Sequence, residues 1–352
     1  MIIEQFLPGF HSGDAVGNSA LQFHKFLCGR GIESRIVALT IDPVLRGQAV
    51  HLRDHRENPQ ALKIYHFAIA SALSEYFCQS QGKKVLLYHN VTPSRFFVGF
   101  SPQLESLTRE AREQLKQVKD RCDFFIADSV FNAKELRELG IKGVFIFPIM
   151  IDWHEYDGLV SRSFADLFRD GRKNLLFVGR VTPNKKIEDL IKILSFYKKC
   201  LSPAVRLIVA GNIHTLPRYY YALRDLATRL QLTAADLVFT GHLPMDEFLA
   251  AYSSAAVFVS MSEHEGFCLP LIESCRFGLP VVAYAAGAVP ETLAGAGLLL
   301  GQKNIAAAAA LIERILNDAP LRERLRQSAL QRFASYQQQA RPEILLSYLE
   351  KL

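Results

Sequence analysis

The feature that most constrains this 352-residue chain is the repeated alternation of short aliphatic runs with amphipathic stretches. Such alternation is typical of βαβ units, in which helices connect the strands of a mainly parallel sheet. A chain of this length exceeds one core of ordinary size, so it fits two α/β domains with a cleft between them. A hydrophobic content of 49% with 22% charged residues agrees with a globular protein rather than a disordered or fibrous one. We therefore predict an α/β fold of two Rossmann-like, doubly wound domains.

Ten short runs are the expected strands, five in each half of the chain. Those of the first half cover residues 2–7, 34–39, 84–89, 123–127 and 144–147. Those of the second half cover residues 174–178, 205–210, 237–239, 255–259 and 279–284, and the chain from residue 305 on has a helical pattern throughout. The segment 148–172 does not continue the alternation of strand and helix patterns, so it looks like a connector. The predicted domains are therefore 1–172, with the connector from about 148, and 173–340, followed by a last helix over about 341–352 that can pack back on the first domain.

Several classes of protein are disfavoured by what the sequence lacks. No apolar run approaches the length that spans a bilayer, and the start lacks the basic and apolar regions of a secretory signal. The six cysteines show neither a CxxC pair nor a Cys/His pattern with zinc spacing, so we expect reduced core thiols in a cytoplasmic protein. The net charge of +6 fits either a solvated surface or an attraction to anionic membrane lipids and phosphorylated ligands. Peripheral contact with the cytosolic face of the membrane stays open, and no nucleic-acid partner is indicated.

Ligands of doubly wound sheets bind beyond the carboxyl ends of the strands, so the loops after strands are the candidates for chemistry. After the first strand, the turn around Gly13 and Asp14 opens a helix whose free amides suit a phosphate or a sugar hydroxyl. The turn is not a GxGxxG motif, and no acidic residue ends the expected second strand, so a nicotinamide site is disfavoured. His89 ends the third expected strand, where it could bond a ligand hydroxyl, support developing charge or serve the structure alone.

The loop after the strand 174–178 carries two cations. Gly179 lets the chain turn tightly, and Arg180 and Lys185 follow it. Departure of a nucleoside diphosphate concentrates negative charge on phosphate oxygens, which two cations at the mouth of a strand would stabilise. A basic loop that faces solvent is the alternative, but the position directly after a strand favours the phosphate.

The segment 263–273 carries the strongest signal in the chain. Pro270 suits the first turn of a helix and Gly278 its end, so the amides just before the helix should point outward as an anion site. Those amides belong to Gly266, Phe267, Cys268 and Leu269. Glu265 lies in the loop before the helix, and Glu273 lies eight positions later within it. Two carboxylates beside two cations would be costly if buried without a ligand that carries hydroxyls and phosphates. A capped helix with solvent-facing glutamates is the alternative.

Two further loops follow strands of the second half. One contains Gly211, and the other contains Gly241 and His242. Each could present backbone groups to a nucleotide base, or each could be an ordinary turn.

Taken together, these elements resemble glycosyltransferase family 4, the retaining enzymes of the GT-B fold. The likeness rests on the Glu-x7-Glu element 265–273, the Gly-Arg-x4-Lys element 179–185, the Thr-Gly-His turn 240–242 and the glycine-containing first loop. These four elements stand in the order of the family, and the likeness runs along nearly the whole chain. The resemblance implies that the two domains face each other across a cleft that holds a nucleotide-sugar donor.

The resemblance also implies roles for residues of the second domain. Arg180 and Lys185 would hold the donor diphosphate. Glu273 would bond the ribose hydroxyls, and Glu265 with the amides of 266–269 would bond the transferred sugar.

For the first domain, the resemblance places His89 near the reacting carbon and lets Gly13 and its neighbours approach the phosphates as the domains close. The residues around Gly13 differ from the plain Gly-Gly pair of the family. This difference leaves the acceptor side open.

The retention implied by the resemblance, without an evident nucleophile, suggests a front-face reaction in which the leaving phosphate helps to deprotonate the acceptor. The sequence contains no Asp-x-Asp, so neither a metal nor another cofactor is expected. The expected donor is UDP-glucose or another UDP-hexose, with GDP-mannose second. The acceptor implied by the family is a saccharide or a lipid-linked molecule in polysaccharide or glycoconjugate assembly.

Three alternatives remain at this point. A sugar phosphorylase would need a lysine-bound pyridoxal phosphate, and a nucleotide-sugar epimerase would share the fold. A non-catalytic subunit that binds nucleotide sugars would be expected to have lost Arg180, Lys185 or Glu265, and all three are present.

Overall fold

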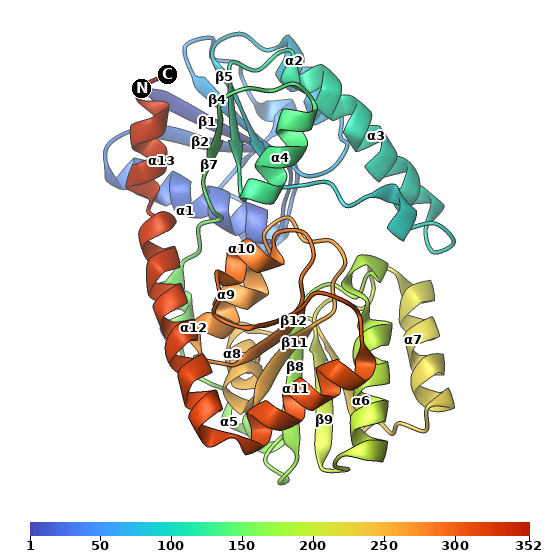
Figure 1. Ribbon diagram of the computed structural model, residues 1–352. Helices are drawn as coiled ribbons and strands as arrows, with labels where there is room; N and C mark the ends of the chain where they lie inside the picture. Colours follow the sequence, from blue (N-terminus) through green and yellow to red (C-terminus); the bar gives the residue numbers. More distant parts are fainter. The chain divides into compact units, whose positions relative to one another are not determined.

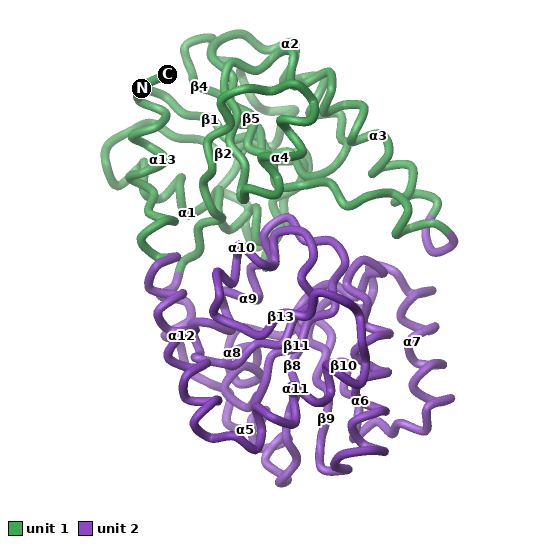
Figure 2. The backbone as a smooth tube through the Cα atoms, viewed as in Figure 1, with its two compact units in different colours: residues 1–98, 102–152, 337–352 green, residues 99–101, 153–336 purple.

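The computed structural model describes all residues from 1 to 352, which group into two compact units (Figures 1 and 2). Unit 1 comprises Met1–Val98, Pro102–Asp152 and Gln337–Leu352, and unit 2 comprises Gly99–Ser101 and Trp153–Tyr336. The second part of the expected connector, 153–172, therefore groups with unit 2. The helix α12 (Ala319–Gln339) begins in unit 2 and ends in unit 1.

Unit 1 is built on seven parallel strands in the order β3-β2-β1-β4-β5-β6-β7. The strands are β1 (Ile2–Phe10), β2 (Glu33–Ile41), β3 (Val50–His51), β4 (Leu62–Phe67), β5 (Lys84–Tyr88), β6 (Phe124–Ala127) and β7 (Val144–Ile146). The helices are α1 (Ala15–Gly29), α2 (Leu73–Gln79), α3 (Pro102–Lys119), α4 (Val130–Glu138) and α13 (Pro342–Leu349), with single 3-10 turns η1 (Pro43–Leu45), η2 (Leu52–Asp54) and η3 (Ser94–Phe96). All five strands expected in the first half are present, and β1 and β2 run further than expected.

The sequence did not indicate the strand β4, although it lies between β1 and β5 and is buried along its whole length. Its sequence LKIYHF places Lys63 and His66 among the apolar residues, which hides the aliphatic run. Both polar side chains are buried, and Lys63 donates hydrogen bonds from Nζ to the carbonyls of Asn58 and Gln81. The burial of these polar side chains is tolerated because they form hydrogen bonds within the protein.

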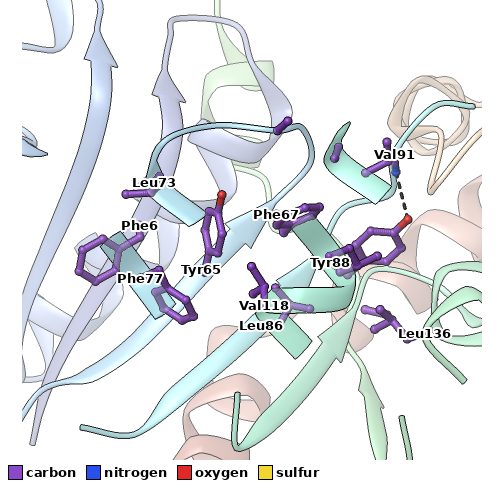
Figure 3. Packing of buried hydrophobic residues seen from close by; sticks show 14 of the residues in the cluster. Phe6, Tyr65, Phe67, Leu73, Phe77, Leu86, Tyr88, Val91, Val118 and Leu136 are labelled. Carbon is purple, nitrogen blue, oxygen red and sulfur yellow. Dashed lines mark hydrogen bonds between the residues drawn. The ribbon is translucent and has the colours of Figure 1, made fainter. Parts of the chain in front are cut away.

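Two apolar cores cover the two faces of this sheet. On one face, Phe6, Tyr65 and Leu86 of the strands pack with residues of α2, α3 and α4 (Figure 3). On the other face, Ile3 and neighbouring strand residues pack with α1 and with three leucines of α13, namely Leu345, Leu346 and Leu349. The last helix of the chain therefore belongs to the core of unit 1.

Unit 2 is built on six parallel strands in the order β10-β9-β8-β11-β12-β13. The strands are β8 (Lys173–Val178), β9 (Val205–Ala210), β10 (Leu237–Gly241), β11 (Val257–Ser260), β12 (Val281–Tyr284) and β13 (Leu298–Leu300). The helices are α5 (Arg162–Asp166), α6 (Ile187–Cys200), α7 (Pro217–Arg229), α8 (Met245–Ser254), α9 (Leu269–Arg276), α10 (Val289–Leu293), α11 (Ile305–Asn317) and most of α12, with 3-10 turns η4 (Trp153–Asp157) and η5 (Pro183–Lys185). The five expected strands are confirmed, as is the helical stretch from residue 305 on, whereas the short β13 was not expected.

No helix is both long enough and apolar enough to cross a bilayer. All six cysteines are free thiols, as expected. Cys268 and Cys275 are buried, but Cys28 and Cys200 are exposed, so the expectation of six core thiols is wrong for these two. Each of the two lies near the end of a helix, at a position that faces solvent.

Candidate active site

The chain order of unit 2 creates a switch point at the strand β8. From β8 the chain adds β9 and β10 on one side of the sheet, and it then returns to add β11, β12 and β13 on the other side. Loops that leave the carboxyl ends of adjacent strands diverge at such a point and leave a crevice between them. The predicted donor-binding residues of the second half lie in these loops, at the last residue of β10 or in α9 directly behind them.

The loops after β8, β9 and β10 are joined by their backbones. The Gly179 amide donates to the carbonyl of Ala210 at 2.9 Å, and the Gly211 amide donates to the carbonyl of Gly241 at 2.9 Å. Gly211 has φ of +145°, and a Cβ atom there would lie 2.1 Å from the carbonyl oxygen of Gly179. Only glycine fits such an approach. At the carboxyl ends of these strands the glycines therefore form a surface of backbone atoms without side chains, which we call the ledge.

Lys185 and Glu265 meet although they come from different loops. The turn η5 carries Lys185, whose Nζ lies 2.7 Å from each carboxylate oxygen of Glu265. The two side chains are 16% and 7% exposed. Asn184 fixes the approach of the loops. Its side-chain amide nitrogen donates to the backbone carbonyl of His264, and its own backbone carbonyl accepts from the backbone amide of Glu263. The structure therefore places a cation and a carboxylate side by side at the switch point.

The loop from Glu265 to Leu269 leads into α9 as expected. Pro270 lies in the first turn, and Cys268 precedes the helix in a left-handed conformation with φ of +68° and no side-chain cap. The residue just before α10 supports the loop, because the Ala288 amide donates to the carbonyl of Glu265 at 2.9 Å. The positive end of the helix dipole, uncapped by a side chain, suits an anion.

Glu273 is enclosed by two tyrosines. Its carboxylate accepts hydrogen bonds from the hydroxyl of Tyr156 at 2.5 Å and from the hydroxyl of Tyr252 at 2.7 Å. Burial raises the pKa of Glu273, and the two hydrogen bonds act in the opposite direction. The alternative of a helix with solvent-facing glutamates is wrong, because Glu273 is 5% exposed and Glu265 is 6% exposed. Sequence reasoning missed both tyrosines, since neither lies in a motif and Tyr156 belongs to the connector.

Most of the remaining predicted donor residues are more open. Arg180 and His242 are exposed, while Gly179, Gly211, Gly241, Gly266 and Leu269 are partly exposed and Phe267 and Cys268 are buried. The Arg180 side chain has no hydrogen bond or ion pair within the protein, in contrast to Lys185. The structure thus brings Lys185 to Glu265 and joins the glycine loops, while Arg180 stands apart from that pair.

The first loop of unit 1 is held by an acidic residue that sequence analysis overlooked. Because β2 ends at Ile41 rather than at 39, Asp42 follows it directly, so the expectation that no acidic residue ends this strand is wrong. Asp42 binds His11 at 2.7 Å and accepts from the Ser12 amide at 2.9 Å. These contacts, led by the one with His11, lower the pKa of Asp42. Both of its carboxylate oxygens therefore serve the loop.

Gly13 and Asp14 lie exposed in this loop. Gly13 has φ of +77°, which glycine adopts readily. Asp14 is the N-cap of α1 and accepts from the Gly17 amide at 3.0 Å. Its side chain is thus engaged in starting the helix.

His89 lies in a buried chain of hydrogen bonds in unit 1. Its Nδ1 is 2.8 Å from Asp128 Oδ2, and its Nε2 is 2.9 Å from Nδ1 of His66. The Nε2 of His66 lies 3.0 Å from the amide oxygen of Gln5, whose nitrogen donates to the carbonyl of Ala20. Both ring nitrogens of His89 are therefore engaged within the protein, and its side chain is 2% exposed.

The donor atoms along this series of hydrogen bonds can be assigned by starting from its end at Ala20. The carbonyl of Ala20 can only accept, so the oxygen of Gln5 faces His66 and must receive a proton from its Nε2. Burial lowers the pKa of His66 well below its usual range, which keeps His66 neutral with an accepting Nδ1. His89 must then donate from Nε2, and one further proton lies between His89 and Asp128. Burial raises the pKa of Asp128, whose Oδ1 has no partner.

An open cavity of about 830 Å³ lies elsewhere in unit 2. It is lined by Lys173 at the start of β8 and by Pro280 just before β12, with residues of α12. These positions mark the amino ends of the strands, opposite to the loops described above.

Comparison with known proteins agrees with this geometry. Residues 161–332 match the family described as Glycosyl transferases group 1. A serotype-specific mannosyltransferase, WbdA of Escherichia coli, is 26% identical over 182 residues, 52% of this chain and 22% of the relative. A GDP-mannose-dependent alpha-mannosyltransferase of Mycobacterium tuberculosis is 36% identical over 118 residues, 34% of this chain and 27% of the relative. The matches thus span about a quarter of the length of these relatives.

Among solved structures, HepE of Anabaena in complex with UDP-glucose matches the whole chain with a TM-score of 0.77 at 16% identity. This likeness shows the GT-B fold with its two parallel Rossmann-like sheets, as predicted. Residues 161–332, which carry the loops after β8, β9, β10 and β11, therefore belong to the glycosyl transferases group 1, glycosyltransferase family 4.

Proposed function

We propose that the protein is a retaining glycosyltransferase that moves a hexosyl group from a nucleotide sugar to a saccharide or lipid-linked acceptor. The observation that carries the proposal is the contact of Lys185 with both carboxylate oxygens of Glu265 at the switch point of unit 2. In a nucleotide sugar, the phosphate that must be neutralised is bonded directly to the sugar carbon that reacts. A cation beside a hydroxyl-binding carboxylate matches that junction.

In this proposal the donor lies over the carboxyl ends of the unit 2 strands. Arg180, Lys185 and the amides before α9 hold the diphosphate, and Glu265 accepts from hydroxyls of the sugar. Glu273 accepts from the ribose, and the ledge at Gly211 and Gly241 receives the base. In unit 1, Gly13 and its neighbours approach the phosphates, and His89 lies near the reacting carbon with both of its ring nitrogens engaged within the protein.

The reaction proceeds at the front face of the sugar. The bond between the anomeric carbon and the phosphate oxygen breaks, and the acceptor oxygen forms its bond on the same face. The acceptor proton passes to the leaving phosphate, so the nucleoside diphosphate departs and the configuration is retained. Stabilising the charge of the departing diphosphate is then the main contribution of Arg180, Lys185 and the α9 amides, without a metal ion.

The sequence relatives bear on the donor. One is named as dependent on GDP-mannose and another as a mannosyltransferase, which raises GDP-mannose from second place to a level with the UDP-hexoses. We therefore place both nucleotide classes in the test.

The purified protein is incubated with UDP-glucose, UDP-galactose or GDP-mannose and a pool of saccharide and lipid-linked acceptors, with and without EDTA. We expect release of one nucleoside diphosphate that depends on acceptor, survives the chelator, and yields a product with the anomeric configuration of the donor by NMR. An inverted product, or activity lost in EDTA and restored by magnesium or manganese, would contradict the mechanism. Absence of transfer from every donor would contradict the proposed activity.

A further inference from the structure

The two ends of the main part of unit 2, residues 153–336, border one aromatic cluster. The chain enters the main part of unit 2 at Trp153 and leaves it after Tyr336. The ring of Trp153 lies 4.8 Å from Phe333 and 5.9 Å from Tyr336, edge to face in both cases, and 4.8 Å from Tyr156. We name Trp153, Tyr156, Phe333 and Tyr336 the crossing cluster. Such packed aromatic pairs restrict the rings that they join.

The helix α9 is attached to the crossing cluster through Arg276. Its guanidinium lies 5.6 to 5.9 Å from the ring centres of Trp153, Tyr156 and Phe333, within the range of cation–π attraction. It also pairs with Asp157 at 2.5 Å. The turn η4, the first segment of unit 2 after the crossing, is therefore fixed to α9 by a charge and by ring contacts.

Tyr156 makes a second attachment at Glu273, three positions before Arg276 and on the same face of α9. Its hydroxyl donates to Oε1 of Glu273, while Tyr252 donates to Oε2. Each carboxylate oxygen can accept two hydrogen bonds, so one position on each oxygen remains after the tyrosines have bound. Two neighbouring acceptor positions on one carboxylate match a vicinal diol.

From this arrangement we propose that Tyr156 is a positioning residue that fixes the carboxylate of Glu273 for the donor's ribose hydroxyls. The inference rests on the proposed function, in which Glu273 meets the ribose. Tyr156 touches no substrate itself; it acts by holding Glu273 in one orientation, and the crossing cluster holds Tyr156. Without the hydroxyl of Tyr156, Glu273 can turn and its two free positions no longer face the diol together.

The test removes the hydroxyl of Tyr156 and the diol of the ribose separately. The dissociation constants of the nucleoside diphosphate that the enzyme releases and of its 2′,3′-dideoxy analogue are measured for the wild type, Tyr156→Phe and Tyr197→Phe. Tyr197→Phe is the matched control, because Tyr197 also donates to a glutamate, Glu313, between α6 and α11. The emission of Trp153, the single tryptophan of the chain, reports whether the cluster is intact in each variant.

We expect the wild type and Tyr197→Phe to bind the ribonucleotide about tenfold more tightly than the dideoxy analogue, as loss of a hydrogen bond to a charged group predicts. In Tyr156→Phe this preference should fall to within about twofold, with unchanged Trp153 emission and a donor KM that rises more than kcat changes. A full preference in Tyr156→Phe overturns the inference alone. Equal binding of both nucleotides by the wild type overturns the assignment of Glu273 to the ribose and the inference with it. Failure of the wild type to bind any nucleoside diphosphate overturns the proposed function.

Discussion

The ammonium of Lys185 lies 2.7 Å from both carboxylate oxygens of Glu265, two residues that are 80 positions apart in the chain. The loops that carry them follow β8 and β11, which are neighbours in the sheet of unit 2. Because Glu265 is nearly buried, the pair serves the fold of the loops as well as the proposed chemistry. This double role separates Lys185 from Arg180, which is exposed.

Lys185→Ala should therefore lower the free energy of unfolding, whereas Arg180→Ala should leave it nearly unchanged. Loss of Lys185 leaves the carboxylate of Glu265 largely buried without its partner, which costs about 1–3 kcal/mol. An exposed arginine without a partner contributes less than about 0.5 kcal/mol. Urea unfolding followed by circular dichroism measures both. Equal stability of the two variants would show that the ion pair does not support the loops.

The two glutamates should differ in their kinetic effects. Glu273→Gln should mainly raise the donor KM, because contact with the ribose is much the same in the ground and transition states. Glu265→Gln should lower kcat more than it alters the donor KM, because its bonds tighten as the sugar flattens and gains charge. Initial rates over a range of donor concentrations give both constants, and circular dichroism confirms folding. Identical patterns in the two variants, or full kcat in Glu265→Gln, would refute this division of roles.

The buried position of Glu273 predicts a pH dependence of donor binding. Burial raises the pKa of Glu273 above the ordinary value of 4.5. A ribose hydroxyl donates to the ionised carboxylate, so the donor KM should rise as the pH falls through this raised pKa, at a higher pH than for an ordinary glutamate. In Glu273→Gln this rise should be absent. A wild-type KM that stays constant down to pH 4.5 would contradict the assignment.

The raised pKa of Glu273 affects the stability of the fold in the opposite direction: low pH weakens donor binding but stabilises the folded protein. The folded protein favours the neutral acid, so the stabilising contribution of protonated Glu273 is fully present below about pH 4.5 and is lost as the pH rises through the folded pKa. The free energy of unfolding of Glu273→Gln should lack this decline.

Sequence patterns predicted most of this fold and part of the site. Aliphatic runs revealed the strands on both sides of the switch point, and Pro270 and Gly278 correctly bounded α9, because these signals depend on local conformation. The sequence did not predict the strand β4, because a buried lysine interrupts its apolar pattern. Lys63 is stabilised by carbonyls that only the folded chain brings near. The contact of Tyr156 with Glu273 spans 117 positions and follows no motif, so no local pattern could reveal it.

The chain of hydrogen bonds through His89 predicts that Asp128 is needed for stability. In Asp128→Ala, Nδ1 of His89 loses its partner, because Nε2 of His89 must still donate to His66. An unsatisfied buried group of this kind costs about 1–3 kcal/mol, so urea unfolding should show a loss of that size. Asp120→Ala, at a residue that is 69% exposed, is the control and should change stability little. A neutral effect of Asp128→Ala would show that the fold does not depend on this hydrogen bond of His89.

The central claim, a nucleotide-sugar site at the carboxyl ends of the unit 2 strands, is tested most directly by titration calorimetry with UDP and with GDP. The wild type should bind at least one of them, and Arg180→Ala and Lys185→Ala should each weaken that binding by about tenfold or more, as expected for loss of about 1.5–3 kcal/mol from a charge-assisted contact. Arg314→Ala, at an exposed residue of α11, should bind as the wild type does. Unchanged affinity in both Arg180→Ala and Lys185→Ala, or no binding of either nucleotide by the wild type, would contradict the account.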